Sequence, residues 1–301
     1  MVSSVRLGAA LAVALTLGAC GPKGPPVAVE AKHPKRTWIE AGSATPRPYV
    51  SPYETVSGCP TTLAQAESVD RVIERGCGPV RVTPDYRLEA GSLTIEAGAR
   101  LEFEASAGLF IGYSHTARLE IRGEPDAPVV LTSASAAPTP GSWEGLRLFP
   151  AAAGSSLAHV ELEYAGDRER SALYVEAPEV SVERMRLRDC AGTAVHVSGD
   201  GWLARYRGNT LSGLSSPVAM LITPASATAF EGDNEFPPGS RIHVLKGFIR
   251  RSGRWGDPGV PFIVTGVIDV AGADEPATLE FAPGVELRFT EGAYINVGYY
   301  D

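Results

Sequence analysis

Short segments of alternating apolar and polar residues recur along most of the chain. The stretch 93–113 alternates, breaks at Gly98, alternates again and breaks at Gly108 and Gly112. Alternation with a period of two over a few residues, bounded by glycine, is typical of short β-strands. The predicted inward residues are Leu93, Ile95, Leu101 and Phe103, and the predicted outward, solvated ones are Thr94, Glu96, Arg100 and Glu102.

The strands also recur on a fixed period. Related segments start at Val160, Arg186, Arg207 and Glu231, each twenty-odd residues after the last. Periods of this size mark solenoids, and strands with no helices between them favour a parallel β-helix, whose coils stack about 4.8 Å apart. A β-sandwich would need longer strands and tight hairpins, and a propeller a period of about 40 residues. We therefore predict an all-β solenoid over residues 79–301.

One segment has a different period. Between Cys59 and Cys77 the apolar residues recur at helical spacing, with Thr61 or Thr62 as an N-cap and Gly76 as a terminator. We predict a short helix in residues 57–78 that caps the N-terminal end of the solenoid. The apolar residues in question are Leu63, Ala66, Val69, Val72 and Ile73.

The N-terminus has the features of a secretory signal. Arg6 precedes an apolar run over residues 7–17, which is too short to span a bilayer. The four residues Leu17-Gly18-Ala19-Cys20 resemble the lipobox of bacterial lipoproteins, which implies a cut before Cys20, removal of residues 1–19 and acylation of Cys20; an ordinary signal peptide is the alternative. Gly21 stands where an aspartate would favour inner-membrane retention, so the resemblance implies an outer-membrane lipoprotein facing the periplasm or the cell exterior.

The segment 20–56 is rich in proline and small residues and has no sustained period, so we predict a flexible tether between the lipid and the solenoid. The net charge of the chain is −8, and removal of Arg6 with the signal makes it −8 − 1 = −9. This acidic balance, with no basic stripe, argues against nucleic acid as a partner.

The remaining cysteines fit an oxidising compartment. Cys59 and Cys77 are expected to form a disulfide, because neither a CxxC motif nor a nearby histidine supplies the other ligands of a metal. Cys190 is expected to be a small buried hydrophobe; its alternative role as a nucleophile has no support beyond nearby His196.

The segment 93–112, with the following LEIRGEPDAPVVLTS and PGSWEGLRLF, resembles the repeats of right-handed parallel β-helix proteins of the pectin-lyase-like superfamily, and is similar to surface lipoproteins of that fold. The resemblance implies fold more than activity, because this fold hosts lyases, hydrolases, adhesins and proteins of other kinds. Trp143 of this motif is expected to pack at a coil corner, with stacking on a sugar as the alternative.

The sequence pattern of residues 93–113 recurs near the C-terminus. Leu93, Gly98, Leu101 and Phe103 match residues of the same types at a constant offset, 279 − 93 = 186. This predicts a second repeat unit that begins near residue 262 and continues past Asp301; the alternative is a degenerate last coil.

Candidate chemistry is sparse. On this fold, polysaccharide lyases and hydrolases carry acids, bases and cation ligands on one exposed sheet face. The sequence contains no HExxH metalloprotease motif, no GxSxG nucleophile elbow, no P-loop and no dinucleotide-binding fingerprint. No catalytic residue, cofactor or metal is therefore predicted. The ligand-binding candidates are Glu161, Glu163, Arg188, Asp189, His196, Asp200 and Trp202 on neighbouring coils, and Arg250, Arg251, Arg254 and Trp255 in a predicted loop over residues 246–261.

Two classes of function follow from these residues. The first, which we prefer, is a noncatalytic, lipid-anchored rod that presents polar and aromatic ladders to a polysaccharide or a surface protein. The second is a polysaccharide lyase or glycoside hydrolase. Acids converging across a groove would favour the enzyme, and smooth, short-looped coils the binding module.

Overall fold

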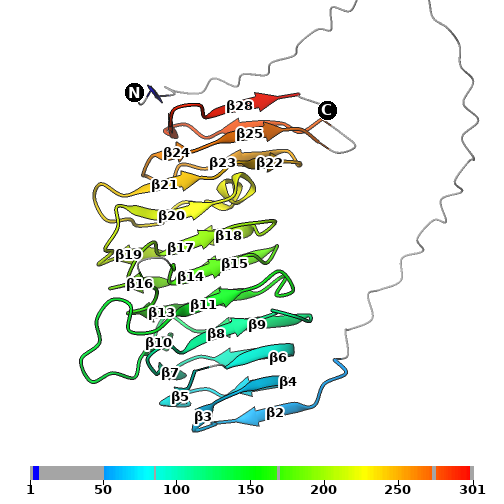
Figure 1. The fold of residues 1–301 in the computed structure, drawn as a ribbon, viewed down its shortest axis with the longest axis vertical. Helices are drawn as coiled ribbons and strands as arrows, with labels where there is room; N and C mark the ends of the chain where they lie inside the picture. Colours follow the sequence, from blue (N-terminus) through cyan, green and yellow to red (C-terminus); the bar gives the residue numbers. More distant parts are fainter. Residues whose placement is uncertain (1–2, 7–50, 85, 168–169, 273–275, 299–301) are drawn as a thin grey trace, which may run out of the picture.

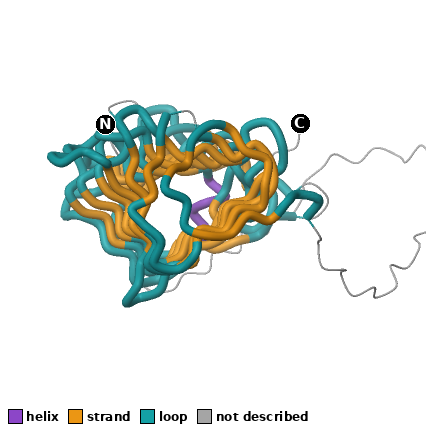
Figure 2. The backbone as a smooth tube through the Cα atoms, turned by 90° about the horizontal axis from the view of Figure 1, so that it is seen from below, coloured by secondary structure: helices purple, strands orange, loops and turns teal. Residues whose placement is uncertain are grey.

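The chain forms a stack of β-coils along one long axis. The computed structural model describes residues 3–6, 51–84, 86–167, 170–272 and 276–298. Strand β2 lies at one end of the stack and β28 at the other, with the intervening strands stacked in order of sequence (Figure 1). Viewed along the axis, the strands of successive coils superpose and the loops project outside them (Figure 2). The predicted parallel β-helix is confirmed.

Most coils lay one strand on each of three faces. Face 1 contains β2 (Thr55–Gly58), β4 (Ala66–Ile73), the second half of β6 (Arg87–Glu96), β9 (Ala117–Arg122), β12 (Ser156–Ala158), β15 (Val180–Glu183) and β18 (Leu203–Arg207). Face 2 contains β8 (Gly108–Ile111), β11 (Gly145–Leu148), β14 (Leu173–Val175), β17 (Val195–Val197), β20 (Val218–Ile222), β21 (Arg241–Val244), β24 (Phe262–Val264) and β27 (Glu286–Phe289). Face 3 contains β3 (Thr62–Leu63), β5 (Val80–Val82), β7 (Arg100–Phe103), β10 (Val129–Ser133), β13 (Val160–Glu163), β16 (Arg186–Arg188) and β19 (Thr210–Ser212).

The remaining elements lie where this pattern changes. The 3-10 helix η1 (Pro224–Ala229) follows β20 and packs against β18 of face 1. Beyond it, β22 (Gly247–Ile249) pairs with β25 (Val267–Val270) and then β28 (Tyr294–Val297), while β23 (Gly253–Trp255) pairs with β26 (Leu279–Phe281). Strand β1 (Ser3–Arg6), from the segment predicted to be the signal sequence, pairs antiparallel with β27. No helix in the described residues has the length and apolarity to cross a membrane.

The register of face 3 shows why the sequence repeats. Consecutive coils place leucine on leucine in a buried inward column, and alternate residues point outward. One outward position is occupied by Glu161, Arg186, Thr210 and Glu235 in successive coils. The related segments of the sequence are therefore equivalent parts of successive coils. The inward column consists of Leu101, Leu131, Leu162, Leu187 and Leu211.

The predicted inward residues are buried, but one predicted solvated residue is not solvated. Leu93, Ile95, Leu101 and Phe103 are all inaccessible to solvent. Thr94 points away from the core as expected, yet only 8% of it is exposed. It pairs with Val72 in the preceding coil and with Glu120 in the next, so this short residue has a coil on each side.

The helix predicted between Cys59 and Cys77 is wrong. Residues 66–73 form β4, which pairs in parallel with β2 on one side and with β6 on the other. The segment is therefore the first part of the solenoid. Helical spacing of a few apolar residues is a weak signal, and β-branched residues such as Val69, Val72 and Ile73 suit a strand whose backbone is paired on both sides.

Cys59 and Cys77 at the ends of this segment form a disulfide, with their Cα atoms 5.1 Å apart. It closes a loop of 18 residues around the first strands. In the chain-entropy account, such a bridge contributes about 3 kcal/mol by restricting the unfolded chain.

The predicted loop over residues 246–261 is also wrong, because it contains β22 and β23. Both strands pair with the next coil, so most of the segment belongs to the solenoid wall. The segment is long and contains glycine, proline and basic residues, as loops do. Its pairing with the next coil depends on residues that are distant in the sequence.

Candidate functional site

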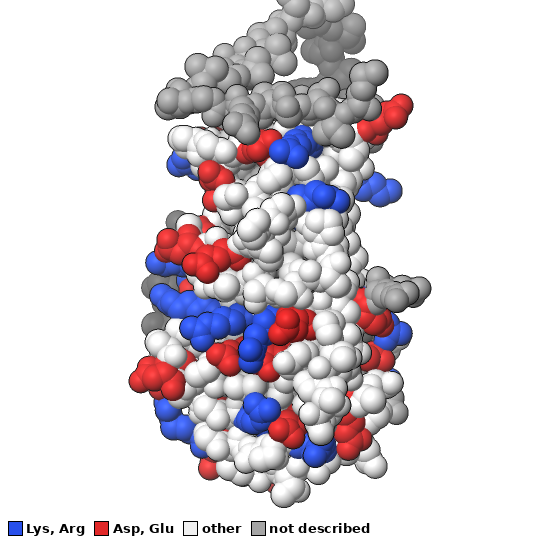
Figure 3. Space-filling view, turned by 90° about the vertical axis from the view of Figure 1, so that its left-hand side faces the viewer, with Lys and Arg blue, Asp and Glu red and all other residues white. Residues whose placement is uncertain are grey.

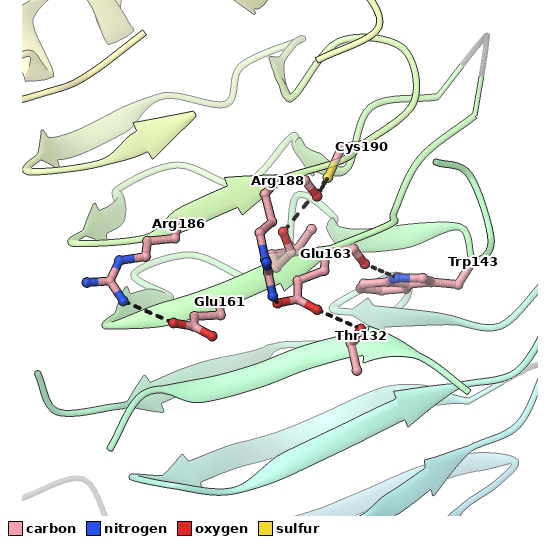
Figure 4. Close-up of polar contacts among 8 residues, drawn as sticks. Thr132, Trp143, Glu161, Glu163, Arg186, Arg188 and Cys190 are labelled. Atoms are coloured by element: carbon pink, nitrogen blue, oxygen red, sulfur yellow. Dashed lines mark hydrogen bonds and ion pairs between the residues drawn. The ribbon is translucent and has the colours of Figure 1, made fainter. Parts of the chain in front are cut away.

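The outward side chains of face 3 form pairs between neighbouring coils. Arg186 Nη1 lies 3.0 Å from Glu161 Oε1, and Arg188 Nε donates to Glu163 Oε1 at 2.7 Å. The pairs follow from the register, which sets β13 against β16 with each glutamate opposite an arginine (Figure 4). On the same face, Arg100 pairs with Glu102 within β7. Each of these carboxylates thus has a cation of the protein as its partner.

Glu163 is the most enclosed of these acids, with 5% of the residue exposed. Thr132 Oγ1 donates to its other carboxylate oxygen, Oε2, at 3.0 Å, and Trp143 Nε1 donates to its backbone oxygen at 2.7 Å (Figure 4). The hydrogen bond to Glu163 raises the pKa of Arg188. The network ties three successive coils together. A carboxylate held in this way is a structural anchor.

Face 2 carries a different outward column. Passing from coil to coil, strand pairing places Phe110 beside Arg147, then Tyr174 and then His196. The column continues through Leu221, His243 and Ile263. Aromatic and aliphatic side chains therefore dominate it, and no aspartate or glutamate stands in it between Phe110 and Ile263.

Side-chain contacts join the members of this column. The guanidinium carbon of Arg147 lies 5.5 Å from the centre of the Tyr174 ring, and the Tyr174 and His196 rings meet edge to face at 5.1 Å. The Tyr174 hydroxyl donates to Glu176 Oε1 at 2.9 Å and lies 2.8 Å from Ser198 Oγ. These bonds fix the ring in a half-buried position, with its orientation set before any ligand arrives.

Arg147 is a buried cation held by backbone oxygens. Its two Nη atoms donate to the oxygens of Ser171 and Glu144, each at 2.8 Å, and 6% of the residue is exposed. Burial, reinforced by Arg170, lowers the pKa of Arg147, although a guanidinium remains charged at neutral pH. Burial, reinforced by Arg147, also lowers the pKa of His196, which is therefore largely neutral at pH 7.

Comparison with known proteins agrees with the architecture. Residues 81–169 match a family model described as a pectate-lyase like beta helix domain. This match and the stacked parallel coils support a parallel β-helix of the pectin-lyase-like type. Searches of curated proteins and of solved structures gave no match.

The predicted site residues lie on different faces and turns of the β-helix. Glu161, Glu163 and Arg188 lie together on face 3, as expected. His196 lies apart from them, on β17 of face 2. Asp200 and Trp202 lie in the turn after that strand, with Asp200 exposed and Trp202 half-buried. The sequence interval between two residues does not fix their face when coils differ in length.

Two further residues lie at the corner after β16. Asp189 is half-buried with a positive φ of 53°, and its backbone N–H donates to Ser212 O at 3.2 Å. Cys190 is fully buried, and burial raises the pKa of its thiol to about 12. A thiol with that pKa is almost wholly protonated at neutral pH, so the prediction of a small buried hydrophobe is confirmed.

The predicted group around Trp255 does not form a stacking site. Trp255 is fully buried between Phe262 and Phe281, with ring centres 5.3 and 5.6 Å away. Arg250, Arg251 and Arg254 are exposed, and Arg250 lies over the ring of Phe248 at 4.7 Å. The tryptophan belongs to the core because β23 turns it inward, which leaves the arginines without the predicted aromatic partner.

Trp143 is a packing residue, as expected. It is 1% exposed and stacks on Phe103 of the preceding coil at 3.9 Å between ring centres, with the rings 12° from parallel. Its only ring nitrogen already donates to Glu163 O. No ring face or donor is left for a sugar.

Cys20 and residues 7–50 lie outside the described part of the chain, so the lipobox and most of the predicted tether are not described by the structure. Within the described residues, no three His, Cys, Asp or Glu side chains gather where they could hold one metal ion.

Proposed function

We propose that this β-helix is a noncatalytic binding module whose face 2 column binds an extended glycan. The observation that carries the proposal is the contrast between faces. The outward ladders on face 3 are filled by ion pairs, whereas face 2 presents aromatic and aliphatic side chains between Phe110 and Ile263. Paired charges keep a surface hydrated; aligned rings with one polar edge offer a sugar both an apolar surface and hydrogen bonds.

The dimensions of the column support an extended ligand. Strands in neighbouring coils lie about 4.8 Å apart, so the seven positions from Phe110 to Ile263 span about 29 Å; Arg147 and Ile263 are buried, and the other five side chains are partly exposed. A ladder of this length can contact several sugar rings in a row, each through a small area. Because the solenoid holds the rings rigidly, little side-chain entropy is lost on binding.

The arrangement of the acids favours binding over catalysis. A glycosidase needs one carboxyl group that gives up a proton and a second across a groove. Glu161 and Glu163 instead stand on one strand, and each is bonded to an arginine of the next coil. Catalysis at this position would first have to break those pairs.

The binding prediction is tested with the purified full-length protein and a panel of neutral and acidic polysaccharides. We expect Phe110→Ala combined with Tyr174→Ala to weaken binding about tenfold or more, because each substitution removes a ring from the column. Phe248→Ala, which removes an aromatic residue 54% exposed on β22, serves as the matched control and should bind as the wild type. Circular dichroism checks that the double variant is folded.

The same samples test for catalysis through release of reducing ends and of unsaturated, ultraviolet-absorbing ends. Depolymerisation that is lost on changing Glu163→Gln would reject the noncatalytic proposal. Undiminished binding by the double variant would reject face 2 as the site.

We further propose that Cys20 anchors the β-helix to the outer membrane through lipid. The support is the short apolar run that ends in the lipobox-like Leu17-Gly18-Ala19-Cys20. Several acyl chains on one residue make an anchor effectively permanent.

Metabolic labelling with a fatty-acid analogue should mark the wild type and leave Cys20→Ser unlabelled, and the variant should move from the membrane to the soluble fraction. Cys190→Ser is the matched control and should label normally. Equal labelling of the wild type and Cys20→Ser would contradict the anchor.

A further inference from the structure

A groove of about 420 Å³ runs along the corner where face 1 turns into face 3. Successive coils each contribute one corner residue to its lining, and these residues all have a positive φ between 50° and 72°. The corner is tight in these four coils for this reason, and side chains of neighbouring coils come to lie side by side along it. The four corner residues are His159, Arg184, Gly208 and Asp233.

The middle of the groove is basic. Arg184, Arg186 and Arg207 line it, and the stem of Arg184 lies over Gly208 of the next coil, where an added Cβ would be 3.3 Å from Arg184 Cγ. Figure 3 shows basic side chains gathered at mid-height on the side of the molecule that carries face 3, with acidic groups above and below them. The glycine leaves room for the arginine to extend along the groove.

The three arginines differ in their partners. Arg186 is bonded to Glu161 at 3.0 Å, and Arg207 Nη1 lies 3.8 Å from Glu231. Arg184 has no ion pair or hydrogen bond from its guanidinium to any described residue. It is the cation in the groove whose donors are free for a ligand.

The pKa of His159 reflects the charges around it. Burial lowers its pKa from 6.5, and Arg184 and Arg186 lower it further, while Glu124 and Glu183 act in the opposite direction. These are the charged groups that face His159 from the neighbouring turns and strands. The two arginines therefore make this part of the groove unfavourable for a further proton and favourable for an anion.

The ends of the groove limit what kind of anion fits. Asp233 and Glu235 line one end, and Glu124 lines the other beside Pro125. These carboxylates repel a polyanion but accept hydrogen bonds from hydroxyl groups. A ligand with one anionic group among several hydroxyls matches both features.

We propose that the corner groove is a second binding site, separate from face 2, for a saccharide that carries a single carboxylate or sulfate group, with Arg184 as the residue that binds the anion. The guanidinium can donate two parallel hydrogen bonds to a carboxylate or sulfate, and the flanking acids accept from the sugar hydroxyls.

The test is a ligand-observed NMR titration of the full-length protein with glucuronate, glucose 6-sulfate and glucose. Glucuronate and glucose 6-sulfate should bind in preference to glucose, and Arg184→Gln should weaken binding of both anionic sugars about tenfold. Arg118→Gln, an exposed arginine of face 1 paired with Glu120, is the matched control and should have no effect. Binding of glucuronate by Arg184→Gln at wild-type strength would overturn the proposal, and so would tighter binding of a heparin hexasaccharide than of glucuronate.

A pH series gives an independent readout. A sulfate stays charged throughout, so affinity for glucose 6-sulfate should rise as the pH falls through the folded-state pKa of His159, which burial and the two arginines lower from 6.5. His159→Gln should abolish the rise; a rise that persists in this variant would show that His159 lies outside the site. Because Phe110 and Tyr174 belong to face 2, their double variant should keep this binding even where glycan binding by face 2 is lost.

Discussion

Replacing Trp143 with alanine is expected to lower the free energy of unfolding by about 3–5 kcal/mol, the usual cost of deleting a large buried aromatic side chain. The ring is 1% exposed and stacks on Phe103 of the preceding coil. Its Nε1 also donates to Glu163 O in the following coil. One side chain thus joins three consecutive coils, and alanine leaves both a cavity and an unbonded backbone oxygen.

The variant Trp143→Phe separates the two contributions. It keeps most of the stacked area and loses the hydrogen bond, so we expect a cost of about 1–2 kcal/mol. Chemical denaturation followed by circular dichroism measures both variants, because removal of the indole changes the fluorescence directly. If Trp143→Ala unfolds at the same denaturant concentration as the wild type, the packing role is wrong.

The repeat of the sequence was sufficient to predict the solenoid, because a period of twenty-odd residues has a direct physical meaning. Each coil must place like residues over like, so Leu101 and its successors recur. The offset noted near the C-terminus also has a structural counterpart, since β27 and β28 start 286 − 100 = 186 and 294 − 108 = 186 residues after β7 and β8. The faces differ, however, for β7 lies on face 3 and β27 on face 2.

The wrong predictions concern segments whose pairing with other strands cannot be inferred from neighbouring residues. Local apolar spacing suggested a helix at residues 66–73, but pairing with β2 and β6 makes this segment a strand. Trp255 was expected beside exposed arginines, whereas the pairing of β23 with β26 turns it into the core. Tertiary pairing overrides a weak local preference in both segments.

The candidate binding face was only partly predictable. His196 was recognised as a candidate, but its neighbours Tyr174, Arg147 and Phe110 were not, because their alignment depends on the length of each coil. Residues 147 and 174 are 27 positions apart, and residues 174 and 196 are 22 apart. A column built from unequal intervals has no visible period in the sequence. The corner groove was missed for the same reason.

The surroundings of Gly145 explain why the PGSWEGL motif has a glycine where a strand would otherwise carry a larger residue. Its φ is +99°, and an added Cβ would lie 2.4 Å from the backbone oxygen of Ala172 in the next coil. The same oxygen accepts the N–H of Leu146 at 2.9 Å. Neither coil can move away without breaking that bond and its neighbours along face 2.

We therefore expect Gly145→Ala to cost about 4 kcal/mol or more, above the range of ordinary substitutions. Gly154→Ala is the matched control, because Gly154 also has a positive φ, +71°, but an added Cβ there meets no atom within 4 Å. The control carries only the backbone cost of about 1–2 kcal/mol.

Hydrogen exchange should locate the damage. In Gly145→Ala, protection should fall in β11 and in β14, which pairs with it, whereas Gly154→Ala should leave both strands protected. Equal destabilisation by the two alanines would mean that backbone conformation alone selects glycine at residue 145. A larger loss in Gly145→Ala would show that the close approach of the two coils selects it, and that the glycine of the motif is a requirement of stacking.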